Sequence, residues 1–261
     1  SPLKYMINIE TLNISGHSAV SLDLGNNLKL QSVDCSNNMI TTLILPTSLI
    51  NLNCSDNYLK ILETSHMKNL TDLDCSNNYM TVLDIRENSK ISNINVNYCP
   101  LTSLSISGNI TGLIGQYVIP NKTGGIIFYA NNIVKIVALK QQSCYWSTEA
   151  RLVDTSSSDG IFNMSQVQML DNWETLYPAF YYCATYGDGN WYLGAWDEVL
   201  AIYNAGVASI VKEFGGKIGS ERFWSSTSTS KTDAKYKHFV TGYNGSQGKG
   251  QSGEAAPIRV L

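Results

Sequence analysis

One pattern of apolar positions, apolar-x-x-apolar-x-apolar-x-x-Asn-x-apolar, recurs five times in the first part of the chain. The copies are spaced by 21, 19, 21 and 21 residues and start at Ile9, Leu30, Leu49, Leu70 and Ile91. Within each copy the apolar-x-apolar alternation predicts a short strand with one face turned inward. A second apolar pair predicts another extended segment on the convex side, and so short a repeat leaves little room for a helix. The pattern therefore predicts a solenoid of stacked, β-rich coils.

The Asn position of the pattern has a structural interpretation. An Asn that turns inward at the end of a strand can satisfy backbone groups of the neighbouring coils, so stacked copies are predicted to form an Asn ladder. The predicted rungs are Asn38, Asn57 and Asn78. His17 and Cys99 stand at this position in the first and last copies, which indicates capping copies.

Cysteines recur in the same register. Cys35, Cys54 and Cys75 each stand three residues before a predicted rung, and equivalent positions of a repeat are not expected to cross-link. No CxxC pair or His spacing supports zinc, so we predict buried thiols that act as small apolar residues. In this Cys- and Asn-rich form (LxCSxNxLTxLxL) the copies resemble the leucine-rich repeats of bacterial surface proteins.

The outward positions of the predicted strands form a concave face of Asn, Asp, Ser and Thr residues. The candidate binding residues on it are Asn53, Asp72, Asp74 and Asn95. The predicted outward positions also include Ser36, Ser55 and Ser76. The face has no aromatic or Arg residue, the types that dominate binding hot spots. Two alternatives stay open, a protein-binding surface and a solvated polar face; calcium at Asp72 and Asp74 is conceivable, but no metal site is predicted.

Beyond Ile106 the pattern ends and the composition changes. Gly and Pro residues crowd the next stretch, and all five Trp residues lie beyond it. We predict a solenoid over 1–115, a linker over 116–124 and a second domain over 125–261. In the second domain strands flank a helical middle, which predicts an α+β domain with its terminal strands paired. The whole chain is thus of a mixed fold class.

Local signals place the elements of the second domain. A hairpin is predicted over 126–139 around Asn131-Asn132. Asn163 with Gln166 resembles a capping box that opens a helix, and Pro178 predicts another helix start. Further helices are predicted over 195–203 and 205–214, the latter stopping at Gly215-Gly216. Further strands are predicted over 223–226, 238–240 and 258–260.

Five motifs appear in order in this domain: GIIFY at 125–129, SDG at 158–160, WYLGxxxE at 191–198, WSST at 224–227 and IRV at 258–260. They resemble the C-terminal domain of bacterial collagen-like adhesins (the Lcl family), which has a C-type-lectin-like fold. Gly194 stands where that family usually has Pro. The resemblance implies an extracellular adhesive module with glycan ligands. The calcium-binding motifs of true C-type lectins are absent, so any glycan binding is expected to be calcium-independent, and Trp191 and Trp224 are predicted to be core anchors.

A Gly-, Ser- and Gln-rich segment over 241–253 is predicted to be a long polar loop between strands. Lectin-like folds vary their binding loops in such places, which makes Tyr243, Asn244 and Gln247 candidate binding residues. A solvated loop without a ligand is the alternative. Cys144 and Cys183 lie in unrelated contexts, and both a disulfide between them and two separate buried thiols stay open.

Composition limits the partners. Of the 261 residues 15% are charged, and the net charge is −3, so the basic excess that drives nucleic-acid binding is absent. No stretch approaches the roughly 20 apolar residues of a membrane helix. No catalytic motif occurs, which predicts a protein that is not an enzyme and needs no cofactor. The chain begins with Ser1-Pro2, which fits removal of a preceding signal or lipid-anchor segment.

Together these features predict a non-enzymatic, monomeric protein of the extracellular space or outer cell surface, with lipid anchoring through a removed N-terminal segment as one option. It is expected to bind a surface or host protein through the repeat face, the lectin-like loops or both. The alternative function is that of a calcium-independent glycan-binding module.

Overall fold

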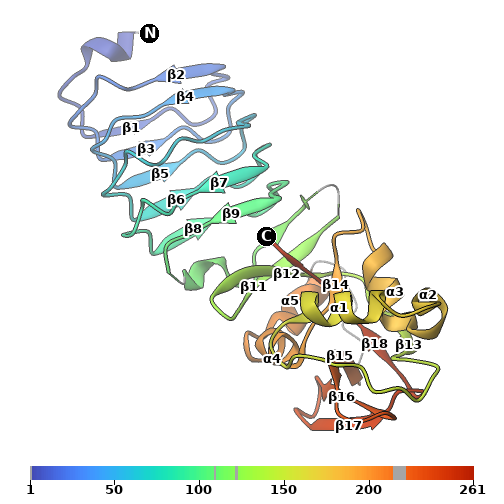
Figure 1. Ribbon diagram of the computed structural model, residues 1–261. Coiled ribbons are helices and arrows are strands. Elements are labelled where there is room, and N and C mark those ends of the chain that lie inside the picture. Colours follow the sequence, from blue (N-terminus) through green and yellow to red (C-terminus); the bar gives the residue numbers. More distant parts are fainter. Residues whose placement is uncertain (1, 109, 121–122, 214–221) are drawn as a thin grey trace. The chain divides into compact units, whose positions relative to one another are not determined.

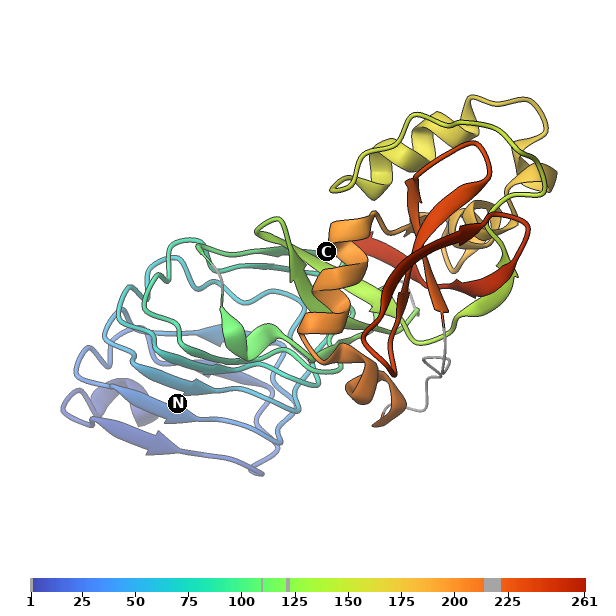
Figure 2. The same cartoon turned by 90° about the horizontal axis from the view of Figure 1, so that it is seen from below.

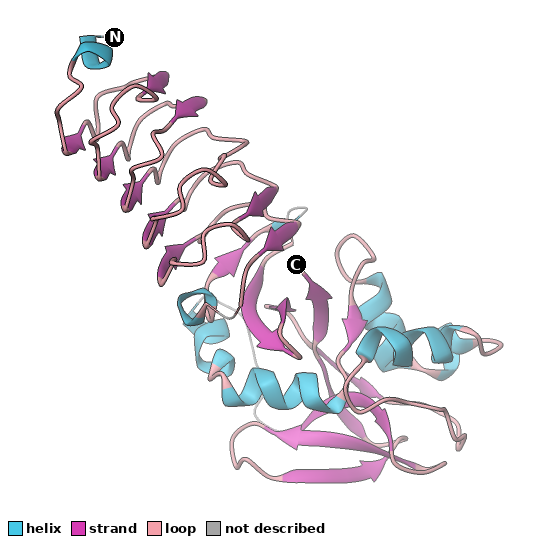
Figure 3. Ribbon diagram, turned by 60° about the vertical axis from the view of Figure 1, so that its left-hand side comes forward, coloured by secondary structure: helices cyan, strands magenta, loops and turns pink. Residues whose placement is uncertain are grey.

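The computed structural model describes residues 2–108, 110–120, 123–213 and 222–261. The chain divides into two compact units, residues 1–122 with Leu261 and residues 123–260. Strands dominate the first unit, whereas most helices belong to the second (Figure 3). Asn121 of the predicted linker and the predicted helix stop at Gly215-Gly216 lie outside the described residues. Within the described ranges, no helix has the length and apolar character needed to cross a membrane.

The first unit is a β-solenoid of about five coils, as the repeat predicts (Figure 1). Each coil contributes one three-residue strand to a parallel sheet, whose neighbouring strands pair in register. In sheet order these strands are β1 (Thr11–Asn13), β3 (Ser32–Asp34), β5 (Asn51–Asn53), β6 (Asp72–Asp74) and β8 (Asn93–Asn95). Equivalent residues of successive copies therefore lie side by side, with Leu52 opposite Leu73.

The second apolar pair of each copy lies on the convex side. There β2 (Ser21–Asp23) pairs with β4 (Thr42–Ile44), and β7 (Val82–Asp84) pairs with β9 (Ser103–Ser105). In the third copy Leu62 and Thr64 are buried without forming a strand. The remaining elements of this unit are the 3-10 helices η1 (Pro2–Tyr5) and η2 (Thr111–Leu113) and the short strand β10 (Tyr117–Val118).

Asn57 shows how one coil is tied to the next. Its side-chain amide donates to three backbone carbonyls at 3.0–3.2 Å, one in the preceding coil and two in its own, and its carbonyl accepts a backbone N–H of the preceding coil at 2.9 Å. Asn38 and Asn78 make equivalent bonds. At the same position of the first and last copies, His17 is exposed and Cys99 is buried.

Cysteines fill the space beside these amides. Cys35, Cys54 and Cys75 have no exposed area, and all are free thiols. Burial raises the pKa of the Cys54 and Cys75 thiols well above the ordinary value, and it raises that of Cys35 to about 12. These side chains therefore stay protonated and pack as small apolar groups.

The described residues of the second unit form two sheets. The first has the order β11-β12-β19-β14 within this unit, and all its pairs are antiparallel. Its strands are β11 (Gly125–Ala130), β12 (Ile133–Ala138), β14 (Tyr192–Leu193) and β19 (Pro257–Val260). The predicted hairpin is confirmed, with Asn131 and Asn132 both at positive φ in its two-residue turn. The predicted pairing of the terminal strands is also confirmed, because β12 pairs with β19.

The second sheet has the order β13-β18-β15-β16-β17. Its strands are β13 (Gln142–Tyr145), β15 (Arg222–Ser228), β16 (Asp233–His238), β17 (Asn244–Gly248) and β18 (Ser252–Ala255). The strand predicted over 238–240 is therefore displaced, since β16 ends at His238. Phe239 instead packs its ring against Phe223, with centroids 4.4 Å apart, so its apolar character serves aromatic packing and not strand pairing.

Five helices complete the second unit among the described residues: α1 (Gly160–Gln168), α2 (Trp173–Leu176), α3 (Pro178–Thr185), α4 (Trp196–Asn204) and α5 (Val207–Glu213). The helix starting at Pro178 is confirmed. The α4 helix packs against β11 of the first sheet and against β15 and β16 of the second (Figure 2). The α3 helix contacts β13, β18 and β19. Helices thus join the two sheets into one core.

The predicted start of the first of these helices is wrong. The helix begins at Gly160, and the Asp159 side chain caps it by accepting a backbone N–H at 2.9 Å. Asn163 lies inside the helix, fully buried, where its amide donates to Ser156 O at 2.9 Å and to Ser226 Oγ at 2.8 Å. The residue that resembles a cap therefore links the helix to a distant strand.

A buried ion pair lies where α4 meets the first sheet. Glu198 is 0% exposed and Lys135 of β12 is 5% exposed, and their side chains are in direct contact. The carboxylate also accepts from Tyr192 Oη at 2.9 Å and from Ala195 N at 2.6 Å. Burial, with the Glu198 charge and hydrogen bond, raises the pKa of Tyr192. A Cβ at Gly160 would lie 2.5 Å from Glu198 Oε2, so glycine is required there.

Candidate functional site

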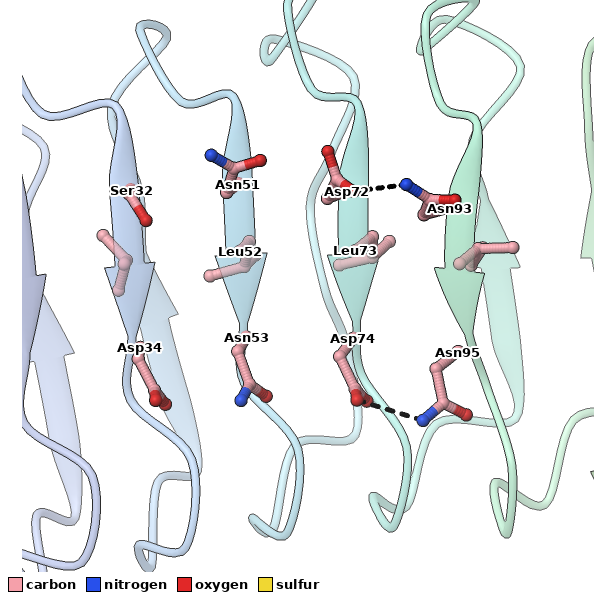
Figure 4. Close-up of a pocket in the computed structure, with 12 residues that line it drawn as sticks. Ser32, Asp34, Asn51, Leu52, Asn53, Asp72, Leu73, Asp74, Asn93 and Asn95 are labelled. Carbon is pink, nitrogen blue, oxygen red and sulfur yellow. Dashed lines mark hydrogen bonds between the residues drawn. The ribbon is translucent and has the colours of Figure 1, made fainter. Parts of the chain in front are cut away.

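The concave sheet of the solenoid forms an open groove across four coils. Side chains of β3, β5, β6 and β8 line a cavity of about 380 Å³. Two polar rows border it, and the apolar middle residue of each strand lies between them (Figure 4). The first row is Ser32, Asn51, Asp72 and Asn93, and the second row is Asp34, Asn53, Asp74 and Asn95. Strand residues alternate between the two faces of the sheet. The middle residues Leu52 and Leu73 are therefore buried, and the polar residues on either side of them lie on the concave surface.

Asp72 is the most constrained carboxylate of the first row. Its Oδ1 accepts from Asn93 Nδ2 at 2.6 Å and its Oδ2 accepts from Thr71 Oγ1 at 2.5 Å. These hydrogen bonds, from Thr71 first and then Asn93, lower the pKa of Asp72 below the ordinary value of 3.8. Asp72 is therefore held ionised and in one orientation at neutral pH.

The second row is shaped by the turns that follow each strand. Asp34, Asn53 and Asp74 each accept the backbone N–H and the hydroxyl of the Ser two residues later, at 2.6–3.1 Å. Asn95 accepts the corresponding N–H of Asn97 and donates to Asp74 Oδ2 at 3.0 Å. These bonds fix the positions of the side chains. Among the described residues, the amide N–H groups of Asn53 have no protein acceptor.

One part of the predicted face is wrong. The strands are three residues long, so each supplies two outward positions, and the Ser that follows is not one of them. Ser36, Ser55 and Ser76 are 5–7% exposed and bond to the preceding carboxylate or amide. Of the predicted binding residues, the structure brings Asn53, Asp72, Asp74 and Asn95 together in this groove. The other polar residues of the lining are Ser32, Asp34, Asn51 and Asn93.

The groove carries negative charge without compensation. Asp34, Asp72 and Asp74 contribute carboxylates, and the described residues that line it include no Lys, Arg or His. No group of three or more His, Cys, Asp or Glu side chains that could hold a metal ion occurs in the described part of the chain. The groove thus offers carboxylate and amide groups for hydrogen bonds with a cationic or donor-rich partner.

The hydrogen bonds to Asp72 predict a depressed titration midpoint. A group whose pKa is lower in the folded state contributes stability above its ordinary pKa and loses that contribution as the pH falls through the lowered value. We therefore expect the Asp72 carboxyl carbon to titrate below 3.8 by carbon-detected NMR. In Thr71→Val and in Asn93→Ala the midpoint is expected to rise toward 3.8, and a midpoint unchanged in both variants would contradict the assigned causes.

The second predicted binding segment has a different structure from the one expected. Segment 241–253 is not a long loop, because most of it forms β17, the connecting turn and β18. Tyr243 is 62% exposed, but Asn244 Oδ1 accepts from Lys237 Nζ at 2.8 Å and Gln247 Oε1 accepts from Arg222 Nη1 at 2.8 Å. The β17 strand pairs with β16, and a Cβ at Gly245 would lie 2.8 Å from the ring of Tyr236, so a glycine is required at this one position. Their role in binding stays a prediction.

The other predicted structural residues lie in the interior of the second unit. Trp191 is 2% exposed and Trp224 is 1% exposed. Trp224 Nε1 donates to the backbone oxygen of Cys144 at 3.0 Å. Cys144 and Cys183 are both free, and of the two alternatives the structure has separate thiols, with Cys183 fully buried and Cys144 partly exposed.

The chain is similar to solved structures of other proteins. No protein-family model and no curated protein matches the chain. Among solved structures, the chain is similar to the functional domain of InlJ from Listeria monocytogenes, which is described as including a cysteine ladder. The identity is 27% and the TM-score is 0.38, and the match covers 42% of this chain and 24% of that chain. The chain therefore spans about a quarter of the length of that structure.

Proposed function

We propose that this chain is a non-enzymatic interaction protein whose concave groove binds an extended, positively charged segment of a protein partner. The observation that supports this most directly is the pair of polar rows on four adjacent strands, which present three carboxylates and several amides without a cation. A Lys or Arg side chain gains charge-assisted hydrogen bonds there. An extended peptide can follow the groove across successive coils.

The groove is also preorganised. Asp72 and Asp74 are each held by two neighbouring side chains, so binding a partner costs little additional side-chain ordering. The strands beneath are paired in register on both sides. These features favour recognition by hydrogen bonds and charge over burial of a large apolar area.

The proposed setting is the extracellular space or the outer cell surface, where the protein serves adhesion. This rests on the resemblance of the repeats, and of the motifs in the second unit, to those of bacterial surface proteins. Cleavage of the chain by protease added to intact cells tests the location, and full protection would contradict it.

We propose a C-type-lectin-like fold for the second unit on the same motifs. Its paired terminal strands and its two sheets with helices between them support this proposal.

Selection from a random-peptide phage library with the full chain tests the binding function. The wild type is expected to enrich peptides rich in Lys and Arg, and the double variant Asp72→Asn/Asp74→Asn is expected to bind the selected peptides about tenfold more weakly, the loss typical of a binding hot spot. Fluorescence anisotropy measures the affinities, which should fall as salt is raised.

A matched control removes the same charge elsewhere. Asp23→Asn/Glu63→Gln neutralises two exposed carboxylates on the convex side and in its loops, and its affinity should equal that of the wild type. If the wild type selects no basic peptides, or if the control loses as much affinity as the groove variant, the proposed role of the groove is wrong.

A further inference from the structure

A second surface of the solenoid follows the carboxyl ends of the concave strands. After β3, β5, β6 and β8 the chain turns through one residue at positive φ, and the loops stack (Figure 4). The residues at this position are Asn37 (53°), Asp56 (53°), Asn77 (51°) and Tyr98 (61°). Each donates its backbone N–H to a carbonyl of the next turn of the chain at 2.7–3.1 Å. The loops are therefore rigidly spaced, by about 4.8 Å per coil as in a parallel sheet.

Three tyrosines project from consecutive stacked loops. Tyr58, Tyr79 and Tyr98 are 48%, 55% and 45% exposed. The rings of Tyr58 and Tyr79 are 5.8 Å apart and tilted by 33°, and Tyr98 contacts the ring of Tyr117 at 5.6 Å. These residues form an aromatic row along the solenoid axis. We refer to Tyr58, Tyr79 and Tyr98 as the tyrosine row.

Polar groups lie beside the tyrosine row. A cavity of about 370 Å³ extends over four coils and is lined by all three tyrosines. Asp56 and Asn77, both exposed, border it with a carboxylate and an amide. The Asn rungs at its floor use their amides on the backbone, whereas Asp56 and Asn77 add side-chain hydrogen-bonding groups to the phenol hydroxyls of the tyrosine row.

The chemistry of this surface excludes several ligand classes. The described residues that line the cavity include no Lys, Arg or His, so phosphate, sulfate and carboxylate groups find no cation and face the Asp56 charge. An apolar helix would leave the Asp56 carboxylate and the Asn77 amide without partners, which is costly once they are desolvated. A ligand with flat apolar faces and many neutral hydroxyl groups has neither disadvantage.

We propose that the tyrosine row, with Asp56 and Asn77, binds a linear neutral glycan that runs along the solenoid axis. The faces of pyranose rings carry C–H groups that pack on aromatic rings, while their equatorial hydroxyls donate to a carboxylate and bond to an amide. One coil per tyrosine places successive rings in a line, which suits a chain of sugar residues. This surface shares no residue with the lining of the concave groove. It is also separate from segment 241–253, where the sequence places the candidate glycan-binding residues.

Tyr98 adds a separate argument. Its equivalents in the preceding coils are Asn37, Asp56 and Asn77, the residue types that tolerate positive φ, whereas a bulky aromatic residue is unusual there. The turn itself does not require tyrosine. The side chain extends the aromatic row by one coil, which is a reason for its presence at a position that disfavours it.

An array of neutral, amino-substituted and sulfated oligosaccharides probed with the full chain tests the proposal. Linear neutral oligosaccharides are expected to bind, with affinity increasing with chain length up to the span of the row. Tyr79→Ala and Tyr98→Asn are each expected to weaken that binding about tenfold. Tyr98→Asn restores the residue type of the preceding coil, so its melting temperature should be no lower than that of the wild type, and lost binding then does not reflect unfolding.

Tyr145→Ala is the matched control, because Tyr145 is 48% exposed and lies in the second unit. It should bind as the wild type does, as should Asp72→Asn/Asp74→Asn, which separates this proposal from that for the concave groove. Silence of the array, preference for sulfated glycans, or binding that both tyrosine variants retain would overturn the proposal. Selection of proline-rich peptides by the tyrosine row in place of glycans would also overturn it.

Discussion

Replacing Asn57 with alanine is expected to lower the free energy of unfolding of the solenoid by about 3–5 kcal/mol, because each buried polar group left unsatisfied costs roughly 1–3 kcal/mol. Asn57 is 3% exposed, and its side chain donates to three backbone carbonyls and accepts one N–H. Alanine fills none of these roles. Differential scanning calorimetry and urea unfolding of the full chain measure the loss.

Asn51→Ala is the matched control for this change. Asn51 belongs to the same coil, but its side chain is exposed on the concave face, so the variant is expected to change the unfolding free energy by no more than about 0.5 kcal/mol. Equal losses in the two variants would show that the amide of Asn57 does not hold the coils together.

The second large effect is expected at Glu198, where substitution by alanine should lower the free energy of unfolding of the second unit by about 3–5 kcal/mol. The change leaves the ammonium of Lys135 buried without its counter-charge, and it removes the acceptor of Tyr192 Oη and Ala195 N. Chemical denaturation followed by tryptophan fluorescence measures it well, since all five Trp residues lie beyond the solenoid.

Two further variants separate charge from packing. Lys135→Met/Glu198→Ala should be less destabilised than Glu198→Ala, because no unpaired charge is left in the interior. Glu174→Ala removes an exposed glutamate from the first turn of α2 and should have little effect. If the double variant is less stable than the single one, the cost at Glu198 comes from lost packing and not from an isolated Lys135 charge.

The repeat could be predicted because its information is local and periodic. In every copy an apolar strand residue stands between polar ones, and the spacing of 19–21 residues places equivalent residues such as Leu52 and Leu73 opposite each other. The extended segments on the convex side could be predicted for the same reason, although Leu62 and Thr64 are buried without forming a strand.

The candidate site was predictable in position but not in detail. Alternation is sufficient to place Asp72 and Asp74 on the concave face. Which of their oxygen atoms are engaged depends on Thr71, Ser76 and residues of the next coil, about twenty residues away, so it emerges only from the stacked structure. The length of each strand decided that the following Ser is buried.

The tyrosine row was missed because it has no exact repeat in the sequence. Tyr58 and Tyr79 follow the Asn rungs, whereas Tyr98 precedes Cys99 at the next rung position. Only the turn geometry, with Tyr98 at positive φ, brings the three rings to one cavity. The sequence does contain one signal of the row: the residue before each rung is Asn37, Asp56 and Asn77 in three copies but Tyr98 in the next.

The sequence by itself determined the coils of the solenoid, the polar character of its concave face and the hairpin at Asn131-Asn132, since each depends on periodicity or on a few neighbouring residues. Only the tertiary structure decided that Asn163 lies inside a helix, that segment 241–253 pairs into the sheet, and that Lys135 meets Glu198. The contacts of Asn163 with Ser226 and of Lys135 with Glu198 each join residues 63 positions apart in the chain. Their energies depend on burial, which local pattern does not specify.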